Sequence, residues 1–192
     1  MPDTAVAAVA AVILAAGGGR RLGGRPKALL THGGEPLVER AVRTARAGGC
    51  ESVVVVLGAE ADEVRRRADL AGCVVAVNQD WTTGMGSSLR AGLAAVPQSC
   101  AAAVILLVDQ PFVTAEAVRA VIAADADVAA ASYEGRRGHP VLIAARHWPE
   151  ASAAAVGDRG ARDFLARHEV VSVPCHGSLA DIDVPEDLML LD

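Results

Sequence analysis

Short apolar runs alternate with amphipathic stretches along this chain. The runs consist almost entirely of Val, Ile, Leu and Ala, which is typical of strands buried on both faces of a parallel sheet. They occupy residues 9–16, 52–57, 73–77 and 102–108. Between them, residues 36–47 and 59–70 carry apolar positions at helical spacing, and Gly48-Gly49 closes the first of these stretches. The alternation predicts repeated βαβ units.

The composition predicts one domain with an aliphatic core. Of 192 residues, 52% are hydrophobic but only 3% are aromatic, so Ala, Val, Leu and Ile must fill the interior. Small side chains allow helices to pack closely on a sheet, and the length suffices for a single core. We therefore expect an α/β fold over residues 1–192, a single-domain three-layer αβα sandwich whose sheet is mostly parallel.

Charge, cysteine spacing and the N-terminus narrow the class of protein. The net charge of −5 argues against general nucleic-acid binding. The N-terminal apolar run follows Asp3 without a basic segment and is too short to span a bilayer, so we expect no secretory signal, no membrane association and a cytoplasmic location. The cysteines form no Cys-x-x-Cys pair and are interpreted as small core residues, not as zinc ligands or a redox motif. They are Cys50, Cys73, Cys100 and Cys175.

A glycine-rich, cationic loop directly follows the first apolar run. Gly17, Gly18 and Gly19 lack a Cβ, so the backbone can turn sharply and present several N–H groups to an anion. Cationic side chains follow in the same loop, and a triphosphate carries about four negative charges, so the loop predicts a triphosphate site. The cationic residues are Arg20, Arg21, Arg25 and Lys27.

This loop differs from two common phosphate-binding motifs. A Walker loop needs Lys-Ser or Lys-Thr after its last glycine, whereas Gly24 is followed by Arg25-Pro26. The third glycine of a dinucleotide-binding Gly-x-Gly-x-x-Gly motif would fall at Leu22, and Pro26 would disrupt the helix that such a motif opens. The alternative to a phosphate site is a solvated turn between a strand and a helix.

A second glycine loop, Gly84-Met85-Gly86, follows the apolar run 73–77 and precedes a predicted helix. Ser87 and Ser88 fit the first turn of that helix, whose unpaired N–H groups and partial positive charge suit an anion or a substrate carbonyl. The alternative is an ordinary capped helix start.

Asp109 stands at the end of the apolar run 102–108, where α/β sheets place their ligands. Mg²⁺ prefers hard oxygen donors and is commonly held by one or two carboxylates together with substrate phosphates, so Asp109 is a candidate metal ligand. The alternative is an aspartate that caps a turn, with Pro111 ending the strand.

Taken together, these motifs resemble the nucleotidyltransferases that attach a nucleotide to molybdopterin, and most closely the molybdenum cofactor cytidylyltransferases. In the last matching segment, Val184 replaces the usual threonine, which removes a hydroxyl that could cap the following helix. The resemblance implies a Rossmann-like fold of the nucleotide-diphospho-sugar transferase type. The matching segments are residues 14–27, 81–89, 109–111, 138–140, 157–162 and 181–188.

The resemblance also implies roles for individual residues. Arg21, Lys27 and Asp109 would be catalytic, and Asp183 would join Asp109 as a ligand of Mg²⁺. Asp181 is the alternative second ligand, and negative charge at a helix start is the alternative role for this acidic segment. The nucleotide would contact Leu14, Ala15, Ala16, Gly17, Gly18, Gly19, Arg21, Lys27, Asn78, Gly86, Ser87 and Ser88. The acceptor would contact Gln110, Pro111, Gly138, His139, Pro140, Asp158 and Arg162.

The reaction implied by the resemblance is transfer of CMP from CTP to molybdopterin or molybdenum cofactor, with release of pyrophosphate. Guanylyltransferases of this family usually carry glycine at the position of Ala16, so Ala16 favours CTP. The attacking phosphate is already ionised, so His139 is interpreted as a substrate contact and not as a general base. A molybdoenzyme maturation protein is the implied partner.

Three other functions remain open. The same resemblance extends to NAD(P)H-dependent oxidoreductases of the nicotine-blue oxidoreductase type, although the missing Gly-x-Gly-x-x-Gly motif weighs against redox chemistry. The second is a guanylyltransferase that acts on another phosphorylated acceptor. The third is a non-catalytic nucleotide-binding protein in molybdoenzyme maturation, which the retained Arg21, Lys27 and Asp109 argue against.

Overall fold

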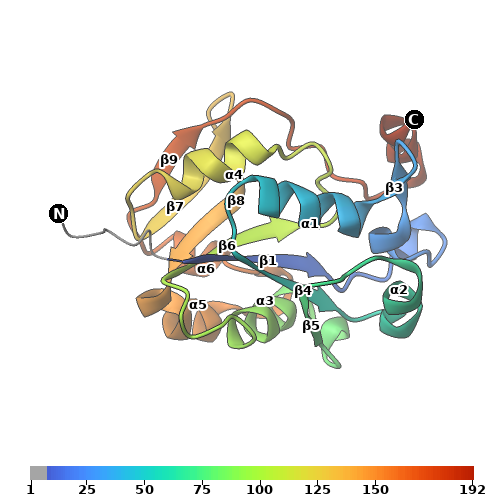
Figure 1. Cartoon of the computed structure of the whole chain (residues 1–192), viewed down its shortest axis with the longest axis horizontal. Helices are drawn as coiled ribbons and strands as arrows, with labels where there is room; N and C mark the ends of the chain where they lie inside the picture. Colours follow the sequence, from blue (N-terminus) through green and yellow to red (C-terminus); the bar gives the residue numbers. More distant parts are fainter. Residues whose placement is uncertain (1–7) are drawn as a thin grey trace.

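The computed structural model describes residues 8–192, which form a seven-stranded sheet between two layers of helices (Figure 1). The strand order is β5-β4-β1-β6-β8-β7-β9, and β2 Thr31–His32 with β3 Glu35–Pro36 forms a separate small sheet. The predicted three-layer α/β fold is confirmed, and residues 1–7 of the expected domain lie outside the described residues. The strands of the large sheet are β1 Val9–Ala15, β4 Ser52–Leu57, β5 Val74–Val77, β6 Ala102–Leu107, β7 Val128–Tyr133, β8 Arg136–Ala144 and β9 Val171–Pro174.

The sheet is mostly parallel, as predicted, with one reversed strand. β1 pairs in parallel with β4 and β6, and β4 pairs in parallel with β5. β8 runs antiparallel to both β6 and β7, whereas β7 and β9 are parallel. Because β1 and β6 are parallel neighbours, their carboxyl ends meet at one edge of the sheet. The beginning of β8 reaches the same edge because that strand is reversed.

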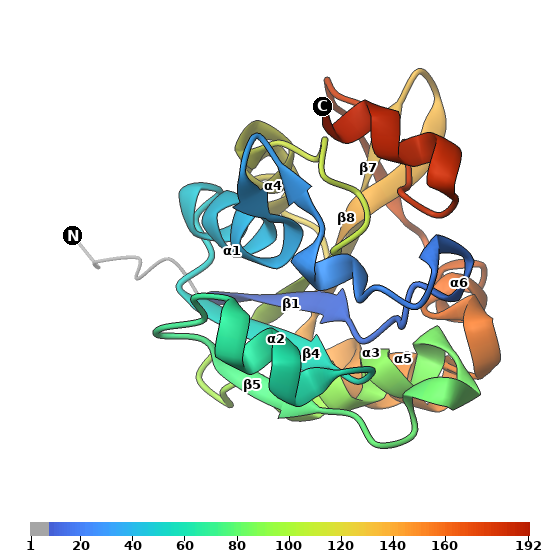
Figure 2. The same cartoon turned by 90° about the vertical axis from the view of Figure 1, so that its right-hand side faces the viewer.

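Helices cover both faces of the sheet (Figure 2). Ile13 of β1 packs in one core with residues of α1, α2 and α4, whereas Val12 packs in a second core with residues of α3, α5 and α6. Successive side chains of a strand point to opposite faces, so all of β1 is buried. The helices are α1 Leu37–Ala47, α2 Ala61–Arg67, α3 Met85–Ala94, α4 Ala115–Ile122, α5 Trp148–Ala154 and α6 Arg162–Leu165.

Small residues let the helices approach the sheet closely. A Cβ added to Gly92 of α3 would lie 2.3 Å from Cγ1 of Val12, so the helix backbone is seated directly on β1. A Cβ on Gly48, after the end of α1, would lie 2.4 Å from Cβ of Val118 in α4. This close packing agrees with the aliphatic, aromatic-poor composition.

Predicted and observed elements differ mainly at their ends. The helix expected over residues 59–70 is shorter, because Glu60 has a left-handed φ of 50° before α2 and Ala68 is extended after it. Cys50 and Cys100 are buried, as expected for core residues, whereas Cys73 and Cys175 are only partly buried, and all of these thiols are free. Within residues 8–192, no helix combines the length and apolar character needed to cross a membrane.

Candidate active site

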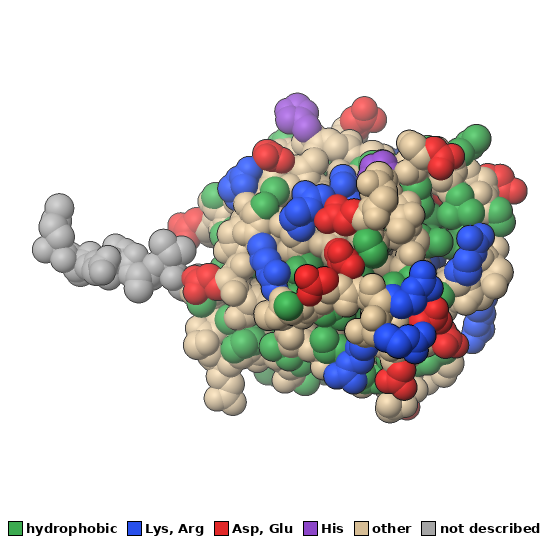
Figure 3. Space-filling model, turned by 45° about the vertical axis from the view of Figure 1, so that its right-hand side comes forward, with side chains coloured by type: hydrophobic (Ala, Val, Ile, Leu, Met, Phe, Trp, Pro, Cys, Tyr) green, Lys and Arg blue, Asp and Glu red, His purple; other side chains and the backbone are tan. Residues whose placement is uncertain are grey.

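The candidate active site lies at the edge of the sheet where β1 and β6 end. The cationic glycine loop leaves β1 at this edge, and Asp109 follows β6 beside it. Figure 3 turns this edge partly toward the viewer and shows Lys and Arg side chains interleaved with Asp and Glu side chains. The topology therefore brings together groups that are far apart in the sequence.

Gly19 makes the tight turn of the first glycine loop. Its φ is 56°, and an added Cβ would lie 2.0 Å from the carbonyl oxygen of Arg25, so this position has both a left-handed backbone and no room for a side chain. The carbonyl of Gly19 accepts from the N–H groups of Leu22 and Gly24 at 2.8 and 3.0 Å. The loop is thus folded back on itself.

Two short 3₁₀ helices, Arg20–Leu22 and Lys27–Leu29, follow the turn, and Pro26 precedes the second of them. This agrees with the prediction that no helix continues through Pro26. The second 3₁₀ helix places Lys27 toward the sheet edge, whereas Arg21 and Arg25 are exposed.

Lys27 joins two of the predicted metal ligands. Its Nζ donates to Oδ2 of Asp109 at 2.7 Å and also to Oδ1 of Asp183. Burial lowers the pKa of the Lys27 ammonium, but the Asp109 and Asp183 carboxylates outweigh burial and the net pKa is raised. Lys27 is therefore a fixed positive charge between two carboxylates.

The C-terminal segment is attached to Asp109 by its backbone. The N–H of Ile182, which is fully buried, donates to the carbonyl of Asp109 at 2.9 Å. Oδ2 of Asp187 accepts from the N–H groups of Asp183 and Val184 at 2.8 and 2.9 Å, at the start of the 3₁₀ helix Pro185–Leu191. Asp187 thus caps this helix where Val184 has no hydroxyl, and the Asp183 carboxylate is left to contact Lys27.

Asp181 and Gln110 form a second pair in the site. Nε2 of Gln110 donates to Oδ1 of Asp181 at 2.7 Å. Burial raises the pKa of Asp181, and the nearby Asp109 and Asp183 carboxylates act in the same direction. Among residues 8–192, Oε1 of Gln110 is a buried side-chain oxygen without a hydrogen-bond partner. The pairing of Gln110 with Asp181 was not predicted. The available signal was the Asp-Ile-Asp spacing, in which Asp181 and Asp183 flank one buried residue.

Asp109 and Asp183 fit a divalent metal ion of the hard class. Their carboxylate oxygens approach the same Nζ atom, so both are within reach of one cation. Mg²⁺ and Mn²⁺ favour oxygen ligands and are usually completed by phosphate oxygens and water. Asp181 is committed to Gln110, which favours Asp183 as the second ligand.

The second glycine loop has a different environment from the first. The predicted helix start is confirmed, because α3 begins at Met85 and contains Ser87 and Ser88 in its first turn. Nδ2 of Asn78 donates to the hydroxyls of Ser87 and Ser88 at 2.8 and 3.0 Å, and all three side chains are buried. A Cβ on Gly86 would lie 2.6 Å from the carbonyl carbon of Ala155. The hydrogen bonds of Asn78 thus join the end of β5 to Ser87 and Ser88 of α3. Gly86 lets the same helix approach residues 155–158.

Trp81 connects the two loops. The guanidinium carbon of Arg20 lies 5.9 Å from the Trp81 ring centroid, and a Cβ on Gly18 would lie 3.3 Å from the same ring. Arg20 is exposed and lies in cation–π range of Trp81. Leu14, Ala15 and Ala16 are buried beneath these loops.

The predicted acceptor residues lie partly on the reversed strand β8. This strand contains Gly138, His139 and Pro140, and Tyr133 Oη donates to the carbonyl of His139 at 2.8 Å. Burial lowers the pKa of His139 to about 4, and the Arg162 guanidinium contributes in the same direction. His139 is therefore a neutral imidazole at pH 7, close to a second predicted acceptor residue.

Two further acceptor residues, Gln110 and Pro111, follow Asp109 at the same edge, where Nε of Arg40 donates to the Pro111 carbonyl at 2.8 Å. Asp158 belongs instead to the segment that packs on the second glycine loop, since a Cβ on Gly84 would lie 2.7 Å from its Oδ1. The predicted acceptor residues therefore divide among three segments: the start of β8, the residues after β6, and residues 158–162.

Comparison with known proteins identifies a family that this chain matches. Residues 11–172 match the family described as MobA-like NTP transferase domain. The chain is 38% identical over 204 aligned residues, covering all of both proteins, to a nicotine blue oxidoreductase of Paenarthrobacter nicotinovorans. It is 33% identical over 187 residues, 92% of each protein, to a molybdenum cofactor guanylyltransferase of Cereibacter sphaeroides.

A solved structure of Rv0371c from Mycobacterium tuberculosis, in complex with manganese, superimposes with a TM-score of 0.83 and 28% identity. The match covers 96% of this chain and 97% of that chain. A structural relative thus binds a divalent metal ion, in agreement with the oxygen-rich donor set at the candidate site.

Proposed function

Because the chain belongs to the MobA-like NTP transferase family and is a nucleotidyltransferase, we propose that it transfers CMP from CTP to a molybdopterin-type acceptor. The observation that carries this proposal is the contact of Lys27 with Asp109 and Asp183 at the end of a cationic glycine loop. A triphosphate with its divalent metal ion needs this combination of cation, carboxylates and backbone N–H groups.

Each group has a separate task in the proposed site. Asp109 and Asp183 would hold Mg²⁺, which when bound neutralises phosphate charge as a Lewis acid. Lys27 and Arg21 would bind the triphosphate, together with the N–H groups of residues 17–19. Because Asp109 and Asp183 both contact Lys27, its ammonium is already beside the place where the metal-bound triphosphate would lie.

The proposed reaction is an in-line displacement. A phosphate oxygen of the acceptor forms a bond to the α-phosphorus of CTP, and the bond from that phosphorus to the β-phosphate oxygen breaks, so that pyrophosphate leaves. The attacking oxygen is already ionised near neutral pH and needs no general base. The neutral His139 fits this scheme as a hydrogen-bonding contact to the acceptor, with Arg162 supplying the nearby positive charge.

Selectivity for the base rests on Ala16. Ala16 is buried directly after β1. A Cβ added to Gly58 would lie 2.8 Å from the Cβ of Ala16, so the backbones at Ala16 and Gly58 are close together. The relative from Cereibacter sphaeroides is a guanylyltransferase, so GTP is the nucleotide against which the CTP preference must be tested.

A second candidate function is NAD(P)H-dependent oxidoreduction, which the full-length identity to nicotine blue oxidoreductase favours. The polar cluster supports nucleotidyl transfer instead. Hydride transfer requires neither a pair of carboxylates nor a lysine between them, whereas metal-assisted phosphate chemistry uses both. The first glycine loop also lacks the spacing of a dinucleotide-binding motif.

Two parallel assays distinguish the candidates. Pyrophosphate release is measured with each of CTP, GTP, ATP and UTP in Mg²⁺, with and without molybdenum cofactor, and NAD(P)H oxidation is followed by absorbance. We expect acceptor-dependent pyrophosphate release that is fastest with CTP. Pyridine-nucleotide oxidation without pyrophosphate release would support the oxidoreductase, and nucleotide binding without either reaction would contradict both enzymatic functions.

The proposed partner is a molybdoenzyme maturation protein that receives the product. Release of a nucleotide-modified cofactor into bulk solvent would expose it, so direct transfer to a partner suits this chemistry. Co-purification of the chain with such a protein only when the cofactor has been modified would support this part of the proposal.

A further inference from the structure

A second polar cluster lies at the opposite edge of the sheet from Lys27 and Asp109. His147 ends the 3₁₀ helix Ala145–His147, Glu150 lies in α5, and His168 follows α6. The last residue of β8, Ala144, pairs with Ala102 at the beginning of β6, whereas Asp109 follows the other end of β6. The cluster is therefore separate from the candidate active site.

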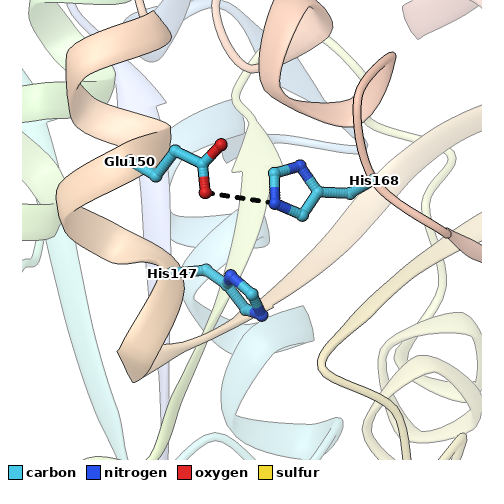
Figure 4. A group of neighbouring side chains, drawn as sticks. All are labelled: His147, Glu150 and His168. Atoms are coloured by element: carbon cyan, nitrogen blue, oxygen red, sulfur yellow. Dashed lines mark ion pairs between the residues drawn. The ribbon is translucent and has the colours of Figure 1, made fainter.

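The three side chains point toward one another (Figure 4). One potential ligand atom from each of His147, Glu150 and His168 lies within 4.8 Å of the other two. Nε2 of His168 lies 3.2 Å from Oε2 of Glu150, which is already the separation of two ligands on a common ion. Two donors bound to zinc at about 2.1 Å in tetrahedral geometry lie about 3.4 Å apart. The separation of His168 and Glu150 already fits this spacing, and the separations to His147 are at most 4.8 Å.

Hydrogen bonding orients the His168 imidazole for metal binding. Nδ1 of His168 lies 2.9 Å from the carbonyl oxygen of Phe164, an acceptor that requires the proton on Nδ1 and leaves Nε2 of a neutral ring free toward Glu150. Nε2 of His147 lies 3.6 Å from Oδ2 of Asp127, which is beyond hydrogen-bond distance, and that oxygen is already paired with Arg146. The carbonyl behind His168 is the usual outer support of a histidine metal ligand.

Packing holds these ligands in place. The His168 ring lies 4.0 Å from the Phe164 ring, centroid to centroid, and the His147 and His168 rings meet edge to face at 5.2 Å. The histidine side chains are 23% and 18% exposed, respectively, whereas Glu150 is 53% exposed. The site thus has two imidazole ligands that are held in place by packing. Its carboxylate is exposed to solvent, so an ion can reach the site from that side.

We propose that His147, Glu150 and His168 bind a divalent ion of the zinc class. Two imidazoles and one carboxylate favour Zn²⁺, Ni²⁺ or Cu²⁺ over Mg²⁺, which prefers oxygen ligands only. Three protein ligands leave a fourth position for water. The bound ion would connect the start of α5 with the segment after α6, and so stabilise the layer of helices that carries Arg162.

The competing explanation is an ordinary ion pair between His168 and Glu150. An ion pair would not require His147, and it would not respond to a transition metal. His147 is therefore the residue that separates the two explanations.

The test is a Zn²⁺ titration of the chelator-treated full chain by calorimetry in excess Mg²⁺, with Co²⁺ absorption spectra as a second readout. We expect one Zn²⁺ per chain, an increase in the thermal unfolding midpoint and a Co²⁺ spectrum typical of nitrogen ligands. Glu150→Gln and His147→Gln should each weaken Zn²⁺ binding at least about tenfold. Loss of a residue that only supports a metal ligand already lowers metal affinity by about 10- to 100-fold, so loss of a ligand itself should cost no less.

Matched controls keep the two metal sites distinct. Glu116→Gln and His176→Gln change exposed residues of the same types elsewhere and should bind Zn²⁺ like the wild type. An Asp109→Asn, Asp183→Asn double variant should also retain Zn²⁺ binding, because the candidate active site is separate. Unchanged Zn²⁺ affinity in both Glu150→Gln and His147→Gln, or no Zn²⁺ binding by the wild type, would overturn the proposal. Since Glu150 is half exposed, Glu150→Gln should fold even if His147→Gln is unstable, and unchanged Zn²⁺ affinity in Glu150→Gln would then overturn the proposal by itself.

Discussion

The two glycine loops resemble each other in sequence but differ in their surroundings. Each follows a strand of the parallel sheet and precedes a helical turn. In the first loop, a Cβ on Gly17 would meet nothing within 4 Å, and the loop continues to Lys27 at the site of Asp109. In the second, Cβ atoms on Gly84 and Gly86 would lie 2.4 and 2.6 Å from backbone carbonyl carbons of Gly157 and Ala155.

Glycine therefore serves two different physical purposes in this molecule. At Gly17 it leaves space and backbone N–H groups available at the sheet edge, which suits a ligand. In the second it permits two segments of backbone to touch, which suits packing. We therefore expect a substitution at Gly17 to change activity and substitutions at Gly84 and Gly86 to change stability.

The largest expected effect is that of substituting Asp109, the carboxylate that Lys27 of the first loop contacts. Asp109→Asn removes the negative charge that would hold the metal ion, so metal-dependent pyrophosphate release should fall by at least about 10³-fold. Steady-state turnover measured across a Mg²⁺ titration checks this. Asp62→Asn, on the exposed surface of α2, is the matched control. Normal turnover with a normal metal titration would remove Asp109 from the metal site.

Lys27→Ala should lower kcat by about 10²- to 10³-fold, or about 2.7–4 kcal/mol, the effect of losing one preorganised donor. Arg25→Ala removes an exposed cation from the same loop and should have little effect. The measurement is kcat with saturating CTP and acceptor, with circular dichroism to establish that both variants are folded. Equal turnover of Lys27→Ala and the wild type would show that the first loop does not act in catalysis.

Gly86→Ala should destabilise the protein by about 1–3 kcal/mol, because the new methyl group would press on the backbone at Ala155. Urea denaturation gives this value directly. A variant as stable as the wild type would mean that residues 155–158 can move away from α3 at little cost, and the contrast between the loops would be lost.

The next effect concerns pH and His139, which lies on β8. The folded-state pKa of His139 is lowered to about 4, below its ordinary value of about 6.5. The unfolded chain therefore binds the proton first, and stability present above about pH 6.5 is lost as the pH falls toward 4. After allowance for the partial exposure of His139, we expect a loss of about 1–2 kcal/mol.

His139→Gln should remove this part of the pH dependence. The difference between the two stability-versus-pH curves isolates His139 from Asp181, whose raised pKa acts in the opposite direction. Parallel curves for both proteins between about pH 6.5 and 4 would contradict the assignment of a neutral imidazole to His139.

The smallest expected effect is that of Gly17→Ala on stability. The new methyl group enters open space and the backbone of Gly17 is not left-handed, so the free energy of unfolding should change by no more than about 0.5 kcal/mol. The KM for CTP should nevertheless rise if residues 17–19 approach the triphosphate closely. A large loss of stability with an unchanged KM would reverse the interpretation of the first loop.

Much of the sheet and part of the site were predictable from local patterns. The strand β4 has the predicted bounds, and β1, β5 and β6 differ from their predictions by one residue at one end. Asp109 was predicted at the carboxyl end of β6 because α/β sheets place ligands there. The reversal of β8 was not predicted, because a buried apolar strand has the same pattern in either direction.

The contact partners of individual residues were less predictable. Asp181 with Gln110, Arg20 with Trp81, and the cluster of His147, Glu150 and His168 all join segments that sequence motifs treat separately. Asn78, Ser87 and Ser88 were expected at the nucleotide, and whether they contact it stays a prediction. Their hydrogen bonds to one another became visible only when β5 and α3 were placed side by side.

The sequence by itself determined the properties that depend on neighbouring residues. These include the alternation of strands and helices, the glycine turn before Lys27, the break at Pro26 and the carboxylate that ends β6. Only the tertiary structure decided which of these groups meet. Lys27 contacts Asp109 and Asp183 across 82 and 156 residues of chain because β1 and β6 are parallel neighbours and Ile182 binds the backbone of Asp109. Strand order and burial decide such contacts, and both depend on the whole chain.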